Sequence, residues 1–353
     1  MYKKFHDFIR TYSKKDFVQD KFDGVYPFDL KDIPLTKYKS FGEKNPDKVF
    51  YVIYRTPYEA GFFSNFAHVV GHLKLIEGTN FIPVVDFQNF KTFYNVDKPI
   101  NGGENSWEYY FEQLSPYSLE EVYQSKNVLF CDGQYPHRVE FSDSEAYEYY
   151  NKVFRVKDDI LTILSQYDEI FANKKVLGVH FRGKDLNIFP GHSFGVTKKQ
   201  MFKYSDEIIE KYGIEKIFVA TDEKSYLDEY IKRYGDMVFY ADNFRTEKIN
   251  EFNINPRDNH RYLLGREVLV DMIMLLRCNG FLHGISNIPI TVNKIKPNFE
   301  FVYEIDNGVN SKNKYFARYL FNIKKRLPKF LGGLLDEVDI KVKKLGGAYE
   351  QRR

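Results

Sequence analysis

The chain is poor in the residues that stabilise small proteins covalently or through metal ions. Its 353 residues include only two cysteines, Cys131 and Cys278, and a single tryptophan. Two isolated cysteines exclude a disulfide framework and a four-ligand cysteine zinc site. Each lies in or after an apolar stretch, so we expect two reduced, buried thiols in a cytosolic protein.

Membrane and targeting signals are also lacking. The first residues, MYKKFHDFIRTYSKKDF, are interrupted by charges and contain no apolar core of a signal peptide. No apolar run approaches the ~18 residues that a membrane-spanning helix needs. We therefore expect a cytoplasmic protein that meets a membrane only peripherally.

The net charge and the common nucleotide motifs exclude further classes. A formal charge of +3 gives no electrostatic support for nucleic-acid binding. The sequence has no G-x-x-x-x-G-K-[ST] loop and no G-x-G-x-x-G fingerprint, which argues against P-loop ATPases and NAD enzymes.

What the sequence does contain is a repeated alternation of strand and helix patterns. A chain of this length accommodates two domains. In the first half, a strand at 48–56, a helix at 62–76 and a strand at 81–86 form a β–α–β unit, which indicates a parallel sheet. We expect an N-terminal domain over 1–170, a C-terminal domain over 171–325, and a basic tail over 326–353 that is either an end helix or a weak interfacial helix.

The second half has the clearer pattern, that of a doubly wound α/β domain. We expect strands at 176–180, 216–221, 237–240 and 280–283, and helices at 197–212, 224–234, 265–277 and 286–294. Ligands of such sheets bind beyond the carboxyl ends of the strands. Three polar clusters fall there: His180–Asp185, Thr221–Glu223 and Gly284–Asn287.

The first candidate site is the segment VLGVHFRGKD, in which a buried strand runs into polar residues. Alternation places His180 and Arg182 on the same side of the strand. Together with Lys184 they supply three potential cations, and arginine can donate two parallel hydrogen bonds to a phosphate. A diphosphate site is one interpretation, and an ion pair between Arg182 and Asp185 is the other.

Two further segments carry candidate binding groups. Asp271 is an acid within an apolar helix, where it either accepts hydrogen bonds from a nucleobase or pairs with Arg266 or Arg277. Ser286 precedes a helix, where it either helps to bind phosphate or is an ordinary N-cap.

Taken in order, these motifs resemble one family. The chain has GxFxN at 61–65, HxRxxD at 180–185, ATDE at 220–223, and a Leu-rich helix with Asp271 followed by Ser286 and Asn287. This pattern resembles the fucosyltransferase superfamily, which includes α1,6-fucosyltransferases and protein O-fucosyltransferases. The resemblance covers roughly residues 48–295.

The resemblance implies a GT-B-like fold, in which two Rossmann-like doubly wound domains face a cleft and the second binds a GDP-sugar. It also implies a role for each matching residue: guanine contacts for His180 and Asp271, β-phosphate contacts for Arg182 and Ser286, neighbouring nucleotide contacts for Asn287 and Asp222, and the cleft of the first domain for Asn65. The implied reaction is inverting transfer of fucose or a related sugar to a glycan hydroxyl, without a cofactor or a metal ion.

The chain departs from the α1,6 group at two places. Gly183 stands where that group has a second arginine, and the stretch NIFPGHSFGV lacks the carboxylate that serves there as the general base. His192 is the candidate base by chemistry, because a neutral imidazole accepts a proton near pH 7. Asp185 and Glu59 are weaker candidates.

Other functions remain open at this point. The same fold could use GDP-heptose or another deoxy-sugar donor. A metal-dependent hydrolase would need ligands such as His180, Asp185, His192 and Asp222, whose spacing matches no metal signature. A non-catalytic glycan- or nucleotide-binding protein would use Trp107 and the many tyrosines and phenylalanines for stacking. The missing membrane segments suit bacterial polysaccharide or glycolipid synthesis, with an oligosaccharide or polysaccharide acceptor and peripheral contact with the inner membrane through the basic tail.

Overall fold

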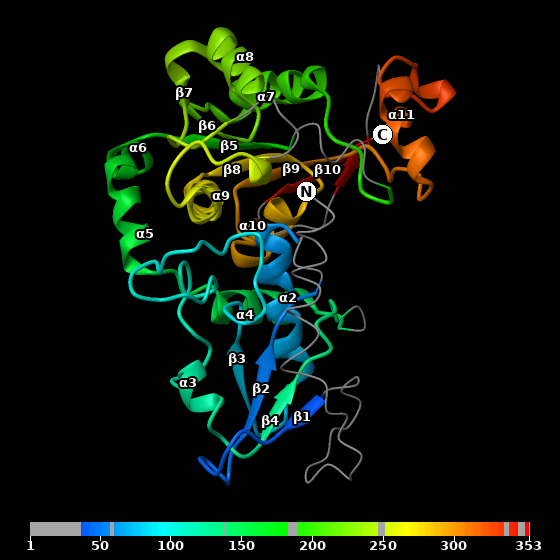
Figure 1. Cartoon of the computed structure of the whole chain (residues 1–353). Helices are drawn as coiled ribbons and strands as arrows, with labels where there is room; N and C mark the ends of the chain where they lie inside the picture. Colours follow the sequence, from blue (N-terminus) through cyan, green and yellow to red (C-terminus); the bar gives the residue numbers. More distant parts are fainter. Residues whose placement is uncertain are drawn as a thin grey trace. The chain divides into compact units, whose positions relative to one another are not determined.

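The computed structural model describes residues 37–56, 60–136, 139–182, 190–245, 251–334, 339–344 and 350–352. They form two compact α/β units (Figure 1). The chain passes from unit 1 to unit 2 between Lys157 and Asp158, ahead of the expected boundary at residues 170 and 171. Residues Arg257–Gly265 also belong to unit 1, so helix α9 (His260–Arg277) contributes to both units.

Unit 1 contains a four-stranded sheet in the order β1-β4-β2-β3. Strand β2 is parallel to both β3 and β4, whereas β1 is antiparallel to β4. Helix α2 connects β2 to β3, which confirms the predicted β–α–β unit. Its strands and helices have these bounds: β1 Lys37–Lys39, β2 Val49–Ile53, α2 Phe62–Leu75, β3 Phe81–Val85, α3 Leu119–Val122, β4 Val128–Phe130 and α4 Asp143–Val153.

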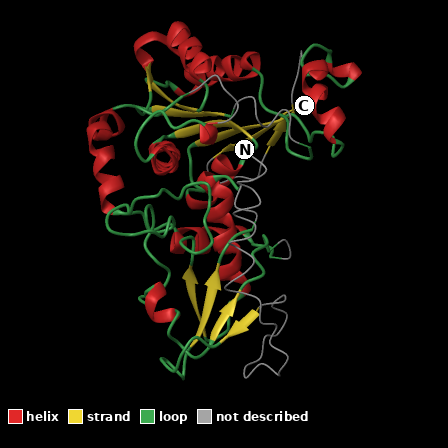
Figure 2. Ribbon diagram, viewed as in Figure 1, coloured by secondary structure: helices red, strands yellow, loops and turns green. Residues whose placement is uncertain are grey.

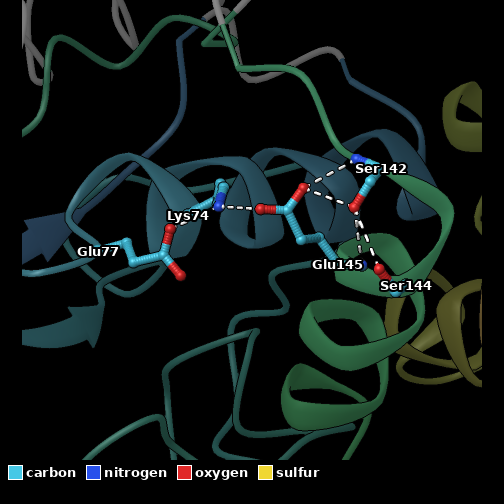
Figure 3. Close-up of polar contacts among 5 residues, drawn as sticks. All are labelled: Lys74, Glu77, Ser142, Ser144 and Glu145. Atoms are coloured by element: carbon cyan, nitrogen blue, oxygen red, sulfur yellow. Dashed lines mark hydrogen bonds and ion pairs between the residues drawn. The ribbon is translucent and has the colours of Figure 1, made fainter.

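A polar contact links α2 to the start of α4. Ser142 caps α4 and forms a capping box with Glu145, because each side chain is bonded to the other residue's backbone N–H. The ammonium group of Lys74, on α2, lies 2.6 Å from Glu145 and 2.5 Å from Glu77 (Figure 3). These hydrogen bonds, first that from Lys74, lower the pKa of Glu145 to about 2.

Unit 2 contains a seven-stranded sheet in the order β11-β10-β9-β8-β5-β6-β7. The strands from β9 to β7 are parallel, and β10 and β11 extend the sheet in antiparallel fashion. The strands have these bounds: β5 Val176–Phe181, β6 Lys216–Thr221, β7 Val238–Phe239, β8 Gly280–Gly284, β9 Phe301–Asp306, β10 Asp339–Lys344 and β11 Glu350–Arg352.

The helices of unit 2 cover both faces of this sheet, as Figures 1 and 2 show. Leu177, Val179 and Phe181 of β5 belong to the apolar core that the sheet shares with α7 and α8. On the other face, a side chain at Gly178 would approach Leu275 and Cys278, at the end of α9. The helices have these bounds: α5 Asp158–Ile163, α6 Asp168–Asn173, α7 Lys198–Tyr212, α8 Lys224–Tyr234, α9 His260–Arg277, α10 Asn287–Ile295 and α11 Lys314–Lys324.

The predicted α/β class is therefore confirmed, with a mainly parallel sheet in each unit. Both cysteines are buried and unpaired, as expected. In the described part of the chain, no helix has the length and apolar character that crossing a membrane requires.

Three details differ from the predictions. Helix α9 begins at His260, five residues before the expected start at Gly265. The end of the basic tail forms strands β10 and β11 and not a helix, because β9 offers an open edge that β10 completes. Strand β9 itself was not predicted, although FVYEID is a β-branched and aromatic run.

Gly280 provides a test of the packing between β8 and β9. A Cβ atom at this position would lie 2.0 Å from the ring of Phe301, which is fully buried and stacks on Tyr212 with ring centroids 3.8 Å apart. We expect Gly280→Ala to destabilise the protein by about 1–3 kcal/mol, measured by chemical denaturation. Adding Phe301→Leu should recover part of the loss, and Gly61→Ala, which meets open space, should change stability little. Unchanged stability of Gly280→Ala would contradict this account.

Candidate functional site

The candidate site lies at the carboxyl edge of the parallel strands of unit 2. His180 stands in register with Ala220 on β6 and with His283 on β8. Strands β5, β6 and β8 therefore end at the same edge. Arg182 and Asp222 follow directly after β5 and β6, and Ser286 lies two residues after the end of β8. The three polar clusters of the sequence thus come from neighbouring strands.

Helix α9 brings Asp271 to the same face of the sheet as His180. Leu275 packs over Gly178, and Asp271 lies one helical turn before Leu275. His180 lies two residues after Gly178, hence on the same face of β5. Because α9 runs opposite in direction to the strand β8 that follows it, the turn that carries Asp271 is displaced from Gly178 toward the carboxyl edge.

Asp271 is a buried carboxylate with unused hydrogen-bonding capacity. Only 8% of the residue is exposed, and its Oδ1 atom is buried without a hydrogen-bond partner. Burial raises the pKa of Asp271 to about 7, an effect that Arg245 and Asn243 oppose and that Glu267 and Asp222 reinforce. One predicted alternative was a pair with Arg277, but that guanidinium lies 2.5 Å from Asp168.

The residues around Asp271 include Arg245, Asn243 and Glu267, which the sequence analysis missed. Arg245 donates to the backbone carbonyls of Thr221, Ala241 and Asn243, at 3.2, 2.9 and 3.1 Å. It thereby fixes the segment after β7 against the end of β6. Glu267, buried one turn before Asp271, accepts from the backbone of Phe244 at 3.2 Å.

These partners are hard to find from the sequence because their segment, ADNFR, has no periodic pattern. The sequence did contain a signal for Glu267, because it is an acid four residues before Asp271 and positions four apart share a helix face.

His180 is neutral at physiological pH, which corrects the prediction of three cations at this strand end. Burial, and then the charge of Arg182, lower the pKa of His180 to about 3. Burial likewise lowers the pKa of the adjacent His283 to about 4. The exposed guanidinium of Arg182 follows this strand end, and Lys184, Asp185 and the weaker base candidate Glu59 lie outside the described residues.

Ser286 occupies the N-cap position of α10 without acting as a cap. Its backbone is extended, and its side chain makes no capping hydrogen bond. The Oγ atom is buried and has no partner. The plain N-cap interpretation is therefore wrong for Ser286. Asn287, the first residue of α10, is exposed at the same helix end.

His192, the candidate base, is an exposed residue in a segment that backbone hydrogen bonds hold in place. Residues 191–194 run antiparallel to residues 308–311, with Asn310 N–H donating to the His192 carbonyl at 2.8 Å. Phe194 N–H donates to the Gly308 carbonyl, also at 2.8 Å. The backbone of His192 is thus fixed, while its ring lies at the surface.

Asn65 belongs to unit 1, whereas the other candidate residues belong to unit 2. It is buried on α2, its Oδ1 has no partner, and its amide donates to the Ala60 carbonyl at 3.4 Å. Asn65 also lines a cavity of about 20 Å³ with Phe66 and Trp107, large enough for one water molecule. Trp107 is only 2% exposed, which argues against its use for sugar stacking.

Unit 1 also holds a cluster of metal-ligand types: His68, His72 and Cys131, whose ligand atoms lie within 4.8 Å of one another. Both ring nitrogens of His72 already have partners, the Tyr51 hydroxyl and the Gln134 carbonyl, each at 3.0 Å. Burial raises the pKa of the Cys131 thiol to about 12. We interpret this cluster as a hydrogen-bonded part of the core.

Comparisons with known proteins find similarity at the level of structure. No model of a protein family matches the chain, and no curated protein matches its sequence. A crystal structure of NodZ α1,6-fucosyltransferase with GDP is similar over 74% of this chain and 96% of that one, with 16% identity and a TM-score of 0.46. The NodZ structure from Bradyrhizobium is similar over 73% and 95%, with 14% identity and a TM-score of 0.40.

A structure of POFUT1 with GDP is similar over 72% of this chain and 71% of that one, with 14% identity and a TM-score of 0.33. At these identities and TM-scores the similarity assigns no role to any residue of this chain. The function has to be argued from the chain's own side chains.

The raised pKa of Asp271 predicts a pH-dependent stability. The folded state binds the proton more tightly than the unfolded state does, so the free energy of unfolding falls as the pH rises from about 4 to about 7. Asp271→Asn mimics the protonated form. In ligand-free protein we expect it to add about 2–4 kcal/mol at pH 8 and much less at pH 5, measured by denaturation. The exposed acid variant Glu210→Gln should do neither, and equal effects of Asp271→Asn at both pH values would refute the explanation.

Proposed function

We propose that the protein is a glycosyltransferase that uses a GDP-sugar, with the donor held by unit 2. The observation that carries this proposal is the pair of unpartnered buried atoms, Asp271 Oδ1 and Ser286 Oγ, at one edge of the sheet. A buried polar atom without a partner costs about 1–3 kcal/mol, so a ligand that supplies both partners gains binding energy. The order of the motifs from His180 to Asn287 supports the same reading.

Each end of a GDP-sugar matches one part of this edge. Guanine presents two adjacent N–H groups, which suit the carboxylate of Asp271, and neutral His180 can donate or accept a hydrogen bond beside it. The diphosphate suits Arg182, the Ser286 hydroxyl and the N-terminus of α10, whose first N–H groups point away from the helix. Asp222 and Asn287 complete the surroundings of the nucleotide.

In the proposed reaction, an acceptor hydroxyl attacks the anomeric carbon and forms the new glycosidic bond with inversion, while the bond to the β-phosphate oxygen breaks and GDP leaves. His192 takes the proton of the hydroxyl. Negative charge develops on the leaving diphosphate, where Arg182 and Ser286 stabilise it. These groups take the place that a metal ion occupies in other sugar transferases. Asn65 is proposed to serve the acceptor side, on unit 1.

Fucose is the proposed sugar, and the proposed acceptor is a glycan hydroxyl in bacterial polysaccharide or glycolipid synthesis. The enzyme would work in the cytoplasm, in peripheral contact with the inner membrane. A panel of GDP-fucose, GDP-heptose, GDP, UDP and ADP in a thermal-shift assay tests the donor. Stabilisation by GDP compounds alone supports the proposal, and equal stabilisation by UDP or ADP would remove guanine recognition.

Arg182 is the residue on which turnover depends most. We expect Arg182→Ala to lower kcat by about 10²–10³, since it removes a donor to the developing charge, while the fold survives because Arg182 is exposed. Donor hydrolysis or transfer assays measure kcat, and circular dichroism measures whether the variant is folded. Near-normal turnover of Arg182→Ala would remove the core of the mechanism.

A variant of Ser286 distinguishes a role in donor binding from a role in folding. We expect Ser286→Ala to weaken GDP binding about tenfold in calorimetry, the loss of one hydrogen bond to a charged group. Its Oγ has no partner in the ligand-free protein, so stability should not fall. A loss of stability with unchanged GDP affinity would assign Ser286 to the fold instead.

The proposed role of His192 as the base is tested by comparing the effects of His192→Ala and Arg182→Ala. His192→Ala should lower kcat by ~10²–10⁴ and leave GDP affinity unchanged, because a base acts on the acceptor and not on the donor. A drop in GDP affinity, or no change in kcat, would exclude His192 as the base.

A further inference from the structure

The exposed apolar side chains of the described residues are concentrated in one short region. Of the large hydrophobic residues that are exposed, six lie between residues 315 and 331. They are Tyr315 (72% exposed), Phe316 (67%), Tyr319 (62%), Ile323 (53%), Phe330 (85%) and Leu331 (58%). We name these six residues the α11 surface. Large apolar side chains exposed together within so short a stretch indicate an interaction site.

Four of these residues lie on helix α11, on the side opposite to the one that is attached to the rest of unit 2. Phe316, Tyr319 and Ile323 follow one another at helical spacing. The opposite side is attached to the unit: Ala317 is fully buried, and its carbonyl accepts from Asn310 at 3.1 Å. Phe321 stacks on Phe194, with ring centroids 6.2 Å apart. Helix α11 is therefore packed against the rest of unit 2 on one side, and the apolar residues on its other side remain exposed.

The charge of this region has a single sign. Residues 307–335 contain no aspartate or glutamate, although the whole chain has 49 acids against 52 Lys and Arg. The same stretch contains seven basic residues: Lys312, Lys314, Arg318, Lys324, Lys325, Arg326 and Lys329. Aromatic and aliphatic side chains beside basic ones on a helix of low overall hydrophobicity are the composition of an interfacial helix.

We propose that the α11 surface docks on the anionic surface of a phospholipid bilayer. The aromatic and aliphatic side chains would enter the boundary between headgroups and acyl chains, and the exposed Lys312, Lys325 and Arg326 would lie among the phosphates. The docking rests on the proposed function at a membrane. It assigns the membrane contact to the α11 surface, which begins at Tyr315, and not to the tail at 326–353.

Charge complementarity selects this partner over a second copy of the chain. In a two-fold dimer the same surface meets itself, so the exposed Lys312, Lys325 and Arg326 would meet a surface of the same charge. A bilayer with acidic headgroups supplies the opposite charge.

The α11 surface also adjoins the candidate base. Residues 308–311, which lead into α11, are hydrogen-bonded to residues 191–194 around His192. Docking by α11 would thus bring the His192 segment near the bilayer, which suits a lipid-linked acceptor.

Vesicle binding by the full chain tests the proposal. We expect co-sedimentation with phosphatidylcholine vesicles that contain about 30% phosphatidylglycerol, at least ~10-fold stronger than with phosphatidylcholine alone and weaker in high salt. Phe316→Ser with Ile323→Ser should lower the affinity ~10-fold or more, as should Lys325→Glu with Arg326→Glu. Phe330→Trp should show a blue-shifted emission on vesicles, since its environment becomes apolar.

Matched controls use exposed residues elsewhere. Tyr147→Ser with Leu161→Ser removes apolar side chains of similar exposure, and Lys199→Glu with Lys232→Glu makes the same change of charge; neither pair should affect binding. Retained binding in both α11 variants, or equal binding to neutral vesicles, overturns the proposal. So does a dimer in light scattering that the apolar variant dissociates, without vesicle binding. None of these measurements needs transfer activity, so GDP binding in calorimetry, unchanged in the α11 variants, reports on the donor site separately.

Discussion

The burial of one carboxylate constrains the whole of the proposed donor site. Asp271 points from α9 into the face of the sheet that also carries His180, and its Oδ1 has no partner there. A carboxylate in such a place is costly unless it is protonated or bonded. Its pKa of about 7 shows that the fold leaves this cost partly uncompensated. Such a cost is tolerable where a ligand supplies the missing donors.

The neighbouring residues limit that cost without removing it. Arg245 lies near enough to lower the pKa of Asp271, but three of its hydrogen bonds go to backbone carbonyls. The positive charge of Arg245 is thereby held near the Asp271 carboxylate, while the N–H groups of its guanidinium bind the loop backbone. Glu267 and Asp222 act in the opposite direction. The result is a group of acidic side chains that favours N–H donors, near a strand end at which Arg182 favours phosphate oxygens.

The sequence predicted those features that depend on local periodicity. Thr197 caps α7 and Gly213 ends it in the left-handed conformation, as their residue types indicate, and α8 has the expected bounds. The common position of the polar clusters was also readable, because carboxyl ends of parallel strands meet at one edge. What could not be read were the long-range consequences. The neutrality of His180 comes from burial under tertiary packing, and Arg245 and Glu267 reach Asp271 through a loop without periodicity.

If the proposed donor site is correct, the unpartnered atoms set folding and donor binding against each other. In ligand-free protein above about pH 7, the ionised Asp271 weakens the fold, whereas in the proposed complex the ionised form would accept two N–H groups of guanine. Donor binding of the proposed kind would therefore favour loss of a proton from a carboxyl that the ligand-free protein prefers to keep, so that proton release and nucleotide binding would be linked. Ser286 contributes to the same opposition without any charge, because a capping bond to α10 would satisfy its hydroxyl and leave it unavailable to phosphate. A site built from such atoms gains affinity by forgoing stability, which is the arrangement expected where selection acts on ligand binding and not on the empty fold.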